Sequence, residues 1–197
     1  MFSGIVETVG KLEKIMIKGT NNSFVISSPI SNELYIDQSI SHNGVCLTVV
    51  AMDDKTHTVT AVEETLLKSN LGNLVEGSFV NIERCITMDT RLDGHMVQGH
   101  VDNTMVCLSK ENREGSWLFS FKYDPEFENL IVDKGSICIN GTSLTVIDPG
   151  EGTLTVTIIP YTYEHTTFKH LGESDIVNVE FDIIGKYVNK YMRSIRG

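Results

Sequence analysis

The sequence has 197 residues and a net charge of −10, with 41% hydrophobic and 21% charged residues, which is the composition of an ordinary globular protein. The negative charge argues against nucleic acid and an anionic membrane surface as partners, because both require a basic surface. No apolar run approaches the about 18 residues of a membrane span, and no basic segment precedes an apolar one at the start, so we expect a cytoplasmic protein.

An internal repeat organises the sequence. Residues 43–83 align without a gap onto residues 140–180, and 15 of these 41 positions are identical. A shorter match pairs residues 1–6 with residues 96–101, so each repeat begins with a similar segment. We therefore predict two domains, at 1–90 and 91–183, joined by a polar linker over 87–94.

Within each repeat the sequence favours strands. Runs rich in β-branched residues occur at 58–62, 80–83, 152–159 and 177–180. Asn43-Gly44 and Asn140-Gly141 each predict a tight hairpin turn between two such runs. With about six short strands and one brief helix per repeat, after Glu63 or Tyr161, we predict an all-β fold of two closed barrels in tandem.

The last segment, 184–197, has the period of a helix with one apolar face. Its apolar residues recur every three or four positions, at Ile184, Tyr187, Val188, Tyr191, Met192 and Ile195. This helix has no counterpart in the first repeat. Its apolar face packs either against its own barrel or against other subunits, and we favour a role in assembly, because a small barrel already fills its own interior.

Four cysteines are spread along the chain, at Cys46, Cys85, Cys107 and Cys138. They form no CxxC pair and have no histidine at metal-ligand spacing, so neither zinc nor a disulfide framework is expected. Each is interpreted as a small buried hydrophobic residue, and only Cys46 has a further argument for a function.

Positions where the two repeats differ are the better guide to function, because shared residues serve the scaffold. Cys46 corresponds to Ser143, Ile5 to His100, Glu63 and Glu64 to Pro160 and Tyr161, and Lys68 to His165. Cys46 and Ser143 each lie two residues before a threonine, on the same face of a strand, which is either a solvated outer face or a site. His100 is a natural proton carrier, although a single histidine can also be structural.

Four motifs together resemble those of the riboflavin synthase family, and the resemblance spans nearly the whole chain. They are residues 1–7 (MFSGIVE), 41–49 (SHNGVCLTV), 94–102 (GHMVQGHVD) and 140–145 (NGTSLT). The resemblance implies two tandem six-stranded Greek-key barrels with short helices, each binding one 6,7-dimethyl-8-ribityllumazine, in a homotrimer held by C-terminal helices. It implies a transferase that needs no metal and no cofactor, and an association with lumazine synthase in some members.

The resemblance also implies the site residues, with backbone groups contacting the pyrimidine edge. The first pocket would use Gly4, Ile5, Val6, Cys46, Leu47, Thr48, Thr60, Ala61, Val62, Glu63, Glu64 and Thr65. The second would use Gly99, His100, Val101, Ser143, Leu144, Thr145, Thr157, Ile158, Ile159, Pro160, Tyr161 and Thr162, with Lys134 as a contact from across a subunit interface.

The hypothesis for catalysis is that His100, with Ser143 or Thr145, helps to remove a proton from the 7-methyl group of the donor lumazine. Ser39, Cys46 or a water molecule could add at C7 as a nucleophile. Two rival functions stay open. One is a lumazine- or flavin-binding protein without activity, although both pockets look intact. The other is the barrel half of a flavin-dependent reductase, which the absence of a G-x-G-x-x-G motif disfavours.

Overall fold

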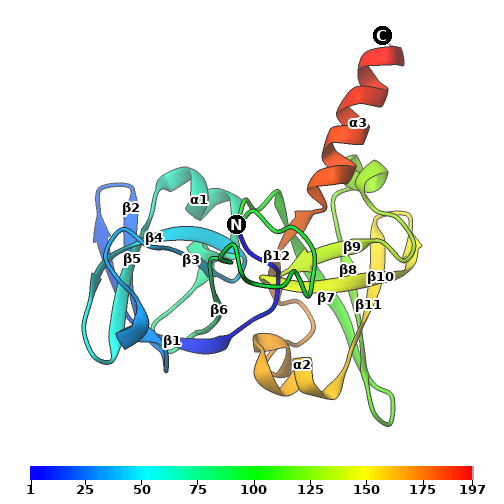
Figure 1. Cartoon of the computed structure of the whole chain (residues 1–197). Helices are drawn as coiled ribbons and strands as arrows, with labels where there is room; N and C mark the ends of the chain where they lie inside the picture. Colours follow the sequence, from blue (N-terminus) through cyan, green and yellow to red (C-terminus); the bar gives the residue numbers. More distant parts are fainter. Residues whose placement is uncertain (197) are drawn as a thin grey trace.

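Residues 1–196, which the computed structural model describes, form two closed antiparallel barrels of six strands each (Figure 1). The first barrel contains β1 (Thr8–Lys18), β2 (Asn21–Ser27), β3 (Ser39–His42), β4 (Val45–Met52), β5 (Thr56–Ala61) and β6 (Phe79–Arg84). The second contains β7 (Asn103–Asn112), β8 (Trp117–Lys122), β9 (Ser136–Ile139), β10 (Thr142–Gly150), β11 (Thr153–Ile158) and β12 (Ile176–Phe181). Around each barrel the strands follow the same Greek-key order, which confirms the predicted tandem repeat.

Short helices connect the strands at matching places in the two repeats. They are η1 (Ser31–Glu33), α1 (Glu63–Lys68) and η2 (Asn70–Asn73) in the first repeat, and η3 (Pro125–Leu130), α2 (Pro160–His165) and η4 (Thr167–Lys169) in the second. α1 and α2 are the brief helices expected after Glu63 and near Tyr161. α1 directly follows β5 and α2 directly follows β11, so the first turn of each helix lies beside the wall of its barrel.

The two Asn-Gly pairs form hairpin turns, as predicted, and they also join the barrels. Asn43 and Gly44 have φ angles of 47° and 80°, and Asn140 and Gly141 have nearly the same values, 46° and 78°. A Cβ atom on Gly44 would lie 2.8 Å from the backbone nitrogen of Gly141. The barrels therefore meet at these two turns, where no side chain fits.

Paired asparagines complete this interface. The amide of Asn81 donates a 2.8 Å hydrogen bond to the carbonyl oxygen of Asn140, and the amide of Asn178 donates one of the same length to the carbonyl of Asn43. Each of these residues is at least nine-tenths buried. Buried amides of this kind require partners, so the identity of these positions in the two repeats follows from contacts across a pseudo-twofold axis.

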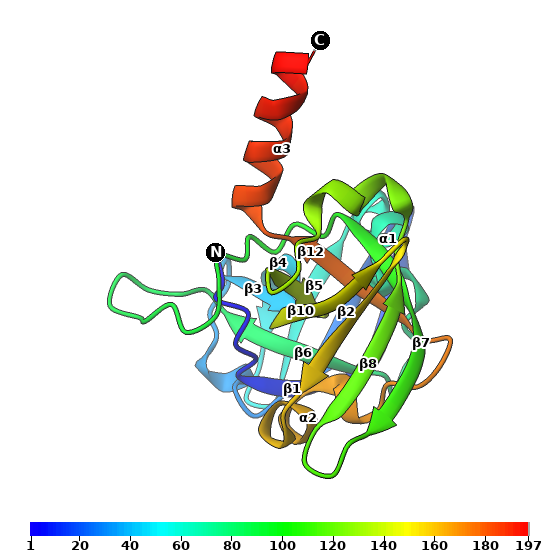
Figure 2. The same cartoon turned by 90° about the vertical axis from the view of Figure 1, so that its right-hand side faces the viewer.

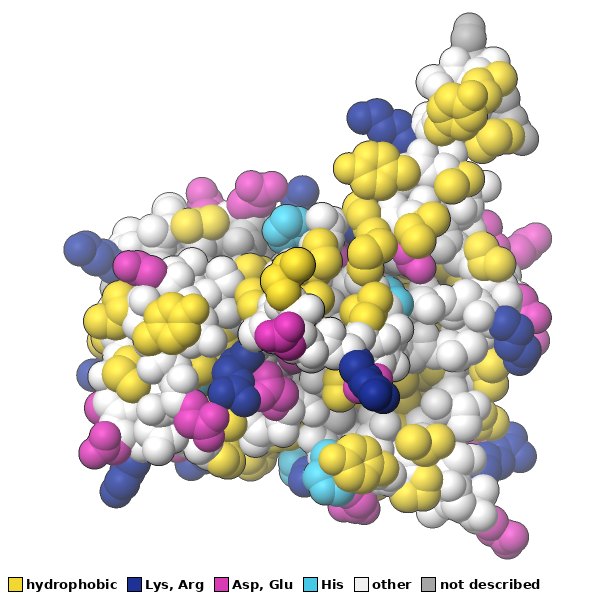
Figure 3. Space-filling model, viewed as in Figure 1, with side chains coloured by type: hydrophobic (Ala, Val, Ile, Leu, Met, Phe, Trp, Pro, Cys, Tyr) yellow, Lys and Arg dark blue, Asp and Glu magenta, His cyan; other side chains and the backbone are white. Residues whose placement is uncertain are grey.

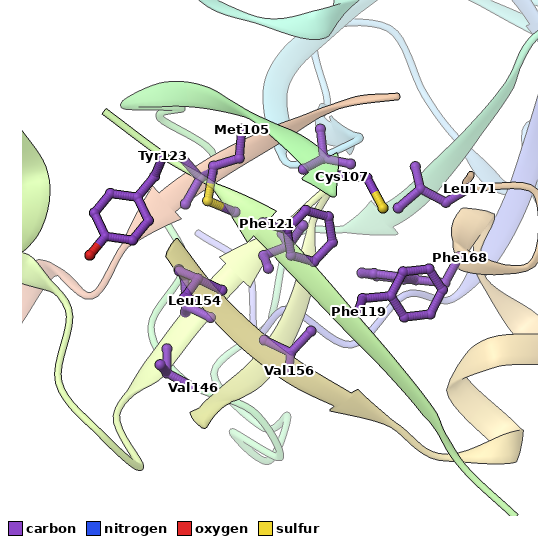
Figure 4. Packing of buried hydrophobic residues seen from close by; sticks show 14 of the residues in the cluster. Met105, Cys107, Phe119, Phe121, Tyr123, Val146, Leu154, Val156, Phe168 and Leu171 are labelled. Carbon is purple, nitrogen blue, oxygen red and sulfur yellow. The ribbon is translucent and has the colours of Figure 1, made fainter. Parts of the chain in front are cut away.

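The barrel interiors are filled by side chains that alternate with outward-facing residues along the strands. Aromatic residues fill much of the second barrel, and Figure 4 shows Phe119, Phe121 and Phe168 among its core side chains. The first barrel has smaller apolar residues together with two histidines. Both interiors are packed, so a small-molecule ligand has to bind outside the barrel walls.

The two histidines in the first barrel face each other in its core. The Nε2 atoms of His42 and His57 are 2.8 Å apart, and Nδ1 of His57 is 2.9 Å from Oγ of Ser31. Burial lowers the pKa of His57 to about 4. Burial, followed by the neighbouring His57, holds the pKa of His42 well below its ordinary value. Ile139 and Leu154 stand at the equivalent positions of the second barrel.

The C-terminal helix α3 (Ile183–Arg196) extends away from both barrels (Figures 1 and 2). The predicted apolar face is present, and Figure 3 shows hydrophobic side chains along the helix. The six apolar residues of this face are each at least 43% exposed, so the face does not pack against its own barrel. Among the described residues, no helix combines the length and the apolar character needed to cross a membrane.

Candidate active site

The segments that precede the two barrels lie between them, and each contacts the barrel of the other repeat. Residues 1–6 and 96–101 come together where Phe2 pairs with Val97 in an antiparallel bridge. The backbone N–H of Cys46 donates to the carbonyl of Gly99 at 2.8 Å, and the N–H of Ser143 donates to the carbonyl of Gly4 at 2.7 Å.

This exchange corrects the predicted grouping of site residues. Within one chain, residues 99–101 lie beside Cys46 of the first barrel and not beside Ser143, and Gly4 lies beside Ser143 and not beside Cys46. The grouping was wrong because the repeat alignment shows which residues are equivalent but not where they lie. Residues 1–6 cross to the second barrel and residues 96–101 cross to the first, and such an exchange leaves the repeat alignment unchanged.

A buried glutamate holds each of the two segments that cross between the barrels, residues 1–6 and 96–101, which we call the crossing segments. Glu83 accepts hydrogen bonds from the backbone N–H groups of Ser3 and Gly4, at 2.7 and 3.0 Å. Glu180 accepts equivalent bonds at 2.7 to 2.9 Å from the backbone N–H groups of residues 98–100. Burial raises the pKa of both carboxyl groups, while these N–H donors oppose the increase. The identity of Glu83 and Glu180 was visible in the repeat, but nothing in the sequence indicated this role.

Gly4 and Gly99 are the points of closest approach. Their φ angles are 76° and 81°, in the left-handed region that favours glycine. A Cβ atom on Gly4 would lie 2.7 Å from Cβ of Ser143, and one on Gly99 would lie 2.5 Å from Cβ of Cys46. Both glycines therefore have a structural reason to be present that is independent of any ligand.

A cavity of about 260 Å³ lies on the outer wall of the first barrel, beside α1. The predicted residues Cys46, Glu64, Thr65, Gly99, His100 and Val101 line it, together with Val45, Lys68 and Ser69, which the prediction of the site left out. Lys68 had a signal in the sequence, because it differs from His165 at the equivalent position. Ser69 had none, since a serine after a short helix is ordinary capping chemistry.

Cys46 is half-buried at the wall of this cavity. Burial raises the pKa of its thiol, and the Ser39 hydroxyl opposes the increase. Since the thiolate is the nucleophilic form, this environment disfavours Cys46 as a nucleophile at neutral pH and suits it to a hydrogen-bonding or packing role. His100 is exposed beside it and accessible to a ligand.

The second barrel carries a different arrangement at the equivalent position. Oγ of Ser143 is 2.7 Å from Nδ1 of His95, whose side chain is almost fully buried. Burial lowers the pKa of His95, and Asp182 opposes the decrease. The sequence did not single out His95, because nothing in its spacing distinguishes it from the other histidines. Thr145 is exposed, and the ring of Tyr161 stacks on His165 at 4.2 Å.

The remaining predicted residues fall into three groups. Ala61 and Ile158 have fully buried side chains and Leu47 a largely buried one, so their side chains face the barrel interiors. Ser39 and Ile5 line a separate cavity of about 900 Å³ beside Arg84 and Arg91. The others lie at barrel surfaces and are half-buried or exposed, namely Val6, Thr48, Thr60, Val62, Glu63, Lys134, Leu144, Thr157, Ile159, Pro160 and Thr162.

Two lumazine-binding domains in tandem define the class of protein: the sequence model of the family described as Lumazine binding domain matches residues 3–85 and again residues 98–182. The fold agrees with the solved structure of LumP complexed with 6,7-dimethyl-8-(1'-D-ribityl) lumazine, at a TM-score of 0.84 and 20% identity over 92% of this chain and 99% of that one.

Curated relatives match almost end to end. The riboflavin synthase of Bacillus amyloliquefaciens is 36% identical over 98% of this chain and 90% of its own length. Those of Schizosaccharomyces pombe and Mycobacterium bovis are 37% and 38% identical over 98% of this chain, and 95% and 99% of theirs. This chain belongs to the riboflavin synthase family.

Proposed function

We propose that this chain transfers a four-carbon unit between two molecules of 6,7-dimethyl-8-ribityllumazine, giving riboflavin and 5-amino-6-(ribitylamino)uracil. The observation that carries this proposal is the pair of equivalent surfaces at Cys46 and Ser143, built on one scaffold but with different reactive groups. Two copies of one substrate fit two related surfaces. Their unequal roles as donor and acceptor fit the differences between those surfaces.

Orientation is the first contribution that such a protein makes. Holding two dilute heterocycles face to face can supply roughly 7–11 kcal/mol of the barrier in favourable cases. The rigid barrels support this role because the walls that carry Cys46 and Ser143 are continuous with packed cores. The side chains then have to move protons and exclude water, while the electron-poor ring of the substrate stabilises its own carbanion.

The productive site would form between subunits of a homotrimer. Within one chain, His100 and Ser143 belong to different surfaces, so their predicted cooperation requires the first barrel of one subunit to face the second barrel of another. The exposed apolar face of α3 supports such an assembly, since it has no partner among the described residues. Lys134, exposed on a loop ahead of β9, would reach the ligand from the neighbouring subunit.

In this site His100 would accept the proton from the 7-methyl group of the donor. Its exposed imidazole beside the cavity suits an exchange of protons with ligand and solvent. Cys46 would line the pocket as a neutral thiol. A water molecule or the hydroxyl of Ser39 would then add at C7 in place of the thiol, with a general base taking up its proton as the bond to carbon forms.

The direct test is to mix the purified protein with the lumazine and follow the absorbance of riboflavin. We expect turnover in the wild-type protein, a large loss of kcat in His100→Gln and Ser143→Ala, and substantial activity in Cys46→Ser. His170→Asn, at an exposed histidine away from the candidate surfaces, serves as the matched control. Lumazine binding without any turnover would refute the proposal in favour of a binding protein.

An association with lumazine synthase and a cytoplasmic location complete the proposal. Co-sedimentation of the chain with a lumazine synthase capsid tests the first, and fractionation of cells tests the second.

A further inference from the structure

His95 makes a contact that no role assigned above explains. Its Nδ1 atom lies 2.7 Å from Oγ of Ser143, and the side chain is 9% exposed. Its backbone N–H donates to the carbonyl of Ser3 at 3.1 Å, which fixes the main chain at this point. The imidazole is thus held from the backbone and has one polar neighbour within hydrogen-bonding distance at Nδ1.

Gly94 makes this arrangement possible. A Cβ atom at Gly94 would lie 2.1 Å from the carbonyl oxygen of Ser3 and 3.0 Å from Oγ of Ser143. Only a residue without a side chain allows the segment to pass this close to the serine. Residues 94–95 therefore pack between the backbone of Ser3 and the hydroxyl group of Ser143, and His95 supplies the titratable group of this cluster.

The neutral charge of the imidazole follows from its surroundings. Burial lowers the pKa of His95, so its imidazole is neutral at physiological pH. Of the two neutral tautomers, the one with hydrogen on Nε2 leaves Nδ1 free to accept the proton of the Ser143 hydroxyl. In that state the lone pairs of Oγ are directed away from the histidine and can accept a hydrogen bond from a ligand.

The first barrel has no such pair. Cys46 takes the place of Ser143, and the side chain that interacts with its thiol is Ser39, which does not titrate near neutrality. The backbone surroundings match, since both residues donate their N–H to a glycine carbonyl of a crossing segment, at 2.7 and 2.8 Å. The two surfaces therefore differ mainly in two places. One is the side chain itself, Cys46 or Ser143, and the other is the side chain that contacts it, Ser39 or His95.

We propose that His95 is a positioning residue for the transfer reaction, which fixes the Ser143 hydroxyl as a hydrogen-bond acceptor toward the lumazine on the second barrel. This inference rests on the proposed function. It gives the second surface an oriented oxygen that the first surface lacks, and so makes the two bound substrates inequivalent.

Three variants separate this role from a structural one. His95→Asn keeps an acceptor near Nδ1 but does not titrate, whereas His95→Leu removes the acceptor. We expect kcat within about threefold of wild type for His95→Asn and a loss of about 10- to 100-fold for His95→Leu, with KM changing less than kcat. The double variant His95→Leu/Ser143→Ala should be no slower than Ser143→Ala, because both act through one hydroxyl.

The pH profile adds a readout that a structural role would not move. Protonation of His95 in acid should contribute to the fall of kcat in the wild-type protein, and His95→Asn should lack that part of the acidic limb, so its profile should be shallower. Circular dichroism at each pH establishes that every variant is folded. Wild-type kcat and pH dependence in His95→Leu, or losses that multiply in the double variant, would overturn the inference while leaving lumazine turnover established.

The tautomer itself gives a test that does not need turnover. The ¹⁵N chemical shifts of His95 should show hydrogen on Nε2 and an accepting Nδ1, and the Nδ1 shift should change in Ser143→Ala. A proton on Nδ1 would refute the inference even if the proposed function holds. If the wild-type protein binds lumazine without turnover, His95→Leu should still bind it about tenfold more weakly than His95→Asn, and equal affinities would refute the positioning role.

Discussion

Replacing His42 and His57 by the residues of the second barrel, His42→Ile with His57→Leu, tests how this buried pair responds to pH. In the folded state both imidazoles are neutral, because burial lowers the pKa of His57 to about 4 and holds that of His42 well below its ordinary value. In the unfolded chain both take up protons below about pH 6.5. Their stabilising contribution is thus present above about pH 6.5 and is lost as the pH falls toward 4.

The magnitude follows from linkage. For a group with a pKa of 6.5 when unfolded and about 4 when folded, lowering the pH from 8 to 5 removes about 2 kcal/mol from the free energy of unfolding. His42, whose pKa burial also holds below its ordinary value, adds to this loss in the same direction. The double variant should therefore lose at least about 2 kcal/mol less than the wild-type protein over this interval.

Urea unfolding followed by circular dichroism, at one protein concentration and at both pH values, measures this difference. Other titrating groups, including Glu83 and Glu180, are the same in both proteins and cancel in the comparison. His165→Gln, at an exposed histidine, is the matched control and should behave as the wild type. An equal loss of stability in the wild-type protein and the double variant would refute the argument.

Two further predictions concern the interfaces. Gly44→Ala should reduce the free energy of unfolding by about 1–3 kcal/mol more than Gly19→Ala. Both glycines have positive φ, but only Gly44 would place a Cβ atom 2.8 Å from the backbone nitrogen of Gly141. Equal losses in urea unfolding would contradict a contact at the turns. Tyr187→Lys with Tyr191→Lys should yield single chains of 21.9 kDa in sedimentation that bind lumazine without turnover, whereas Lys190→Gln should assemble normally. An active single chain would exclude a site between subunits.

Features that depend on local pattern could be predicted from the sequence. Strands follow from alternating β-branched residues, the hairpin turns from Asn43-Gly44 and Asn140-Gly141, and the helix from the period of its apolar residues. The duplication came from aligning the sequence with itself, residues 43–83 with 140–180, and it indicated two copies of one barrel. The strands, turns and helix rest on neighbours in the chain and the duplication on this self-alignment, so one sequence is enough to show all of them.

Features that depend on contacts between distant segments could not be predicted. The crossing of residues 1–6 and 96–101 changes which barrel His100 serves, yet it leaves the repeat alignment unchanged. His42 and His57 lie on separate strands, and only closure of the barrel makes them neighbours. His95 is a candidate only because it contacts Ser143, which lies 48 residues further along the chain. The pattern of residue types near each of these histidines is ordinary.

The position of the pseudo-twofold axis explains which residues of the two repeats match and which differ. Gly44 packs against Gly141, its own counterpart. Asn81 donates a hydrogen bond to Asn140, and Asn178 donates the equivalent bond to Asn43. At the axis a change in one repeat has to fit the other, so divergence there is costly. Cys46 and Ser143 lie two residues after Gly44 and Gly141. Each contacts a crossing segment, whereas Gly44 and Gly141 contact each other. That separation lets the scaffold stay symmetric while the side chains of the two surfaces differ.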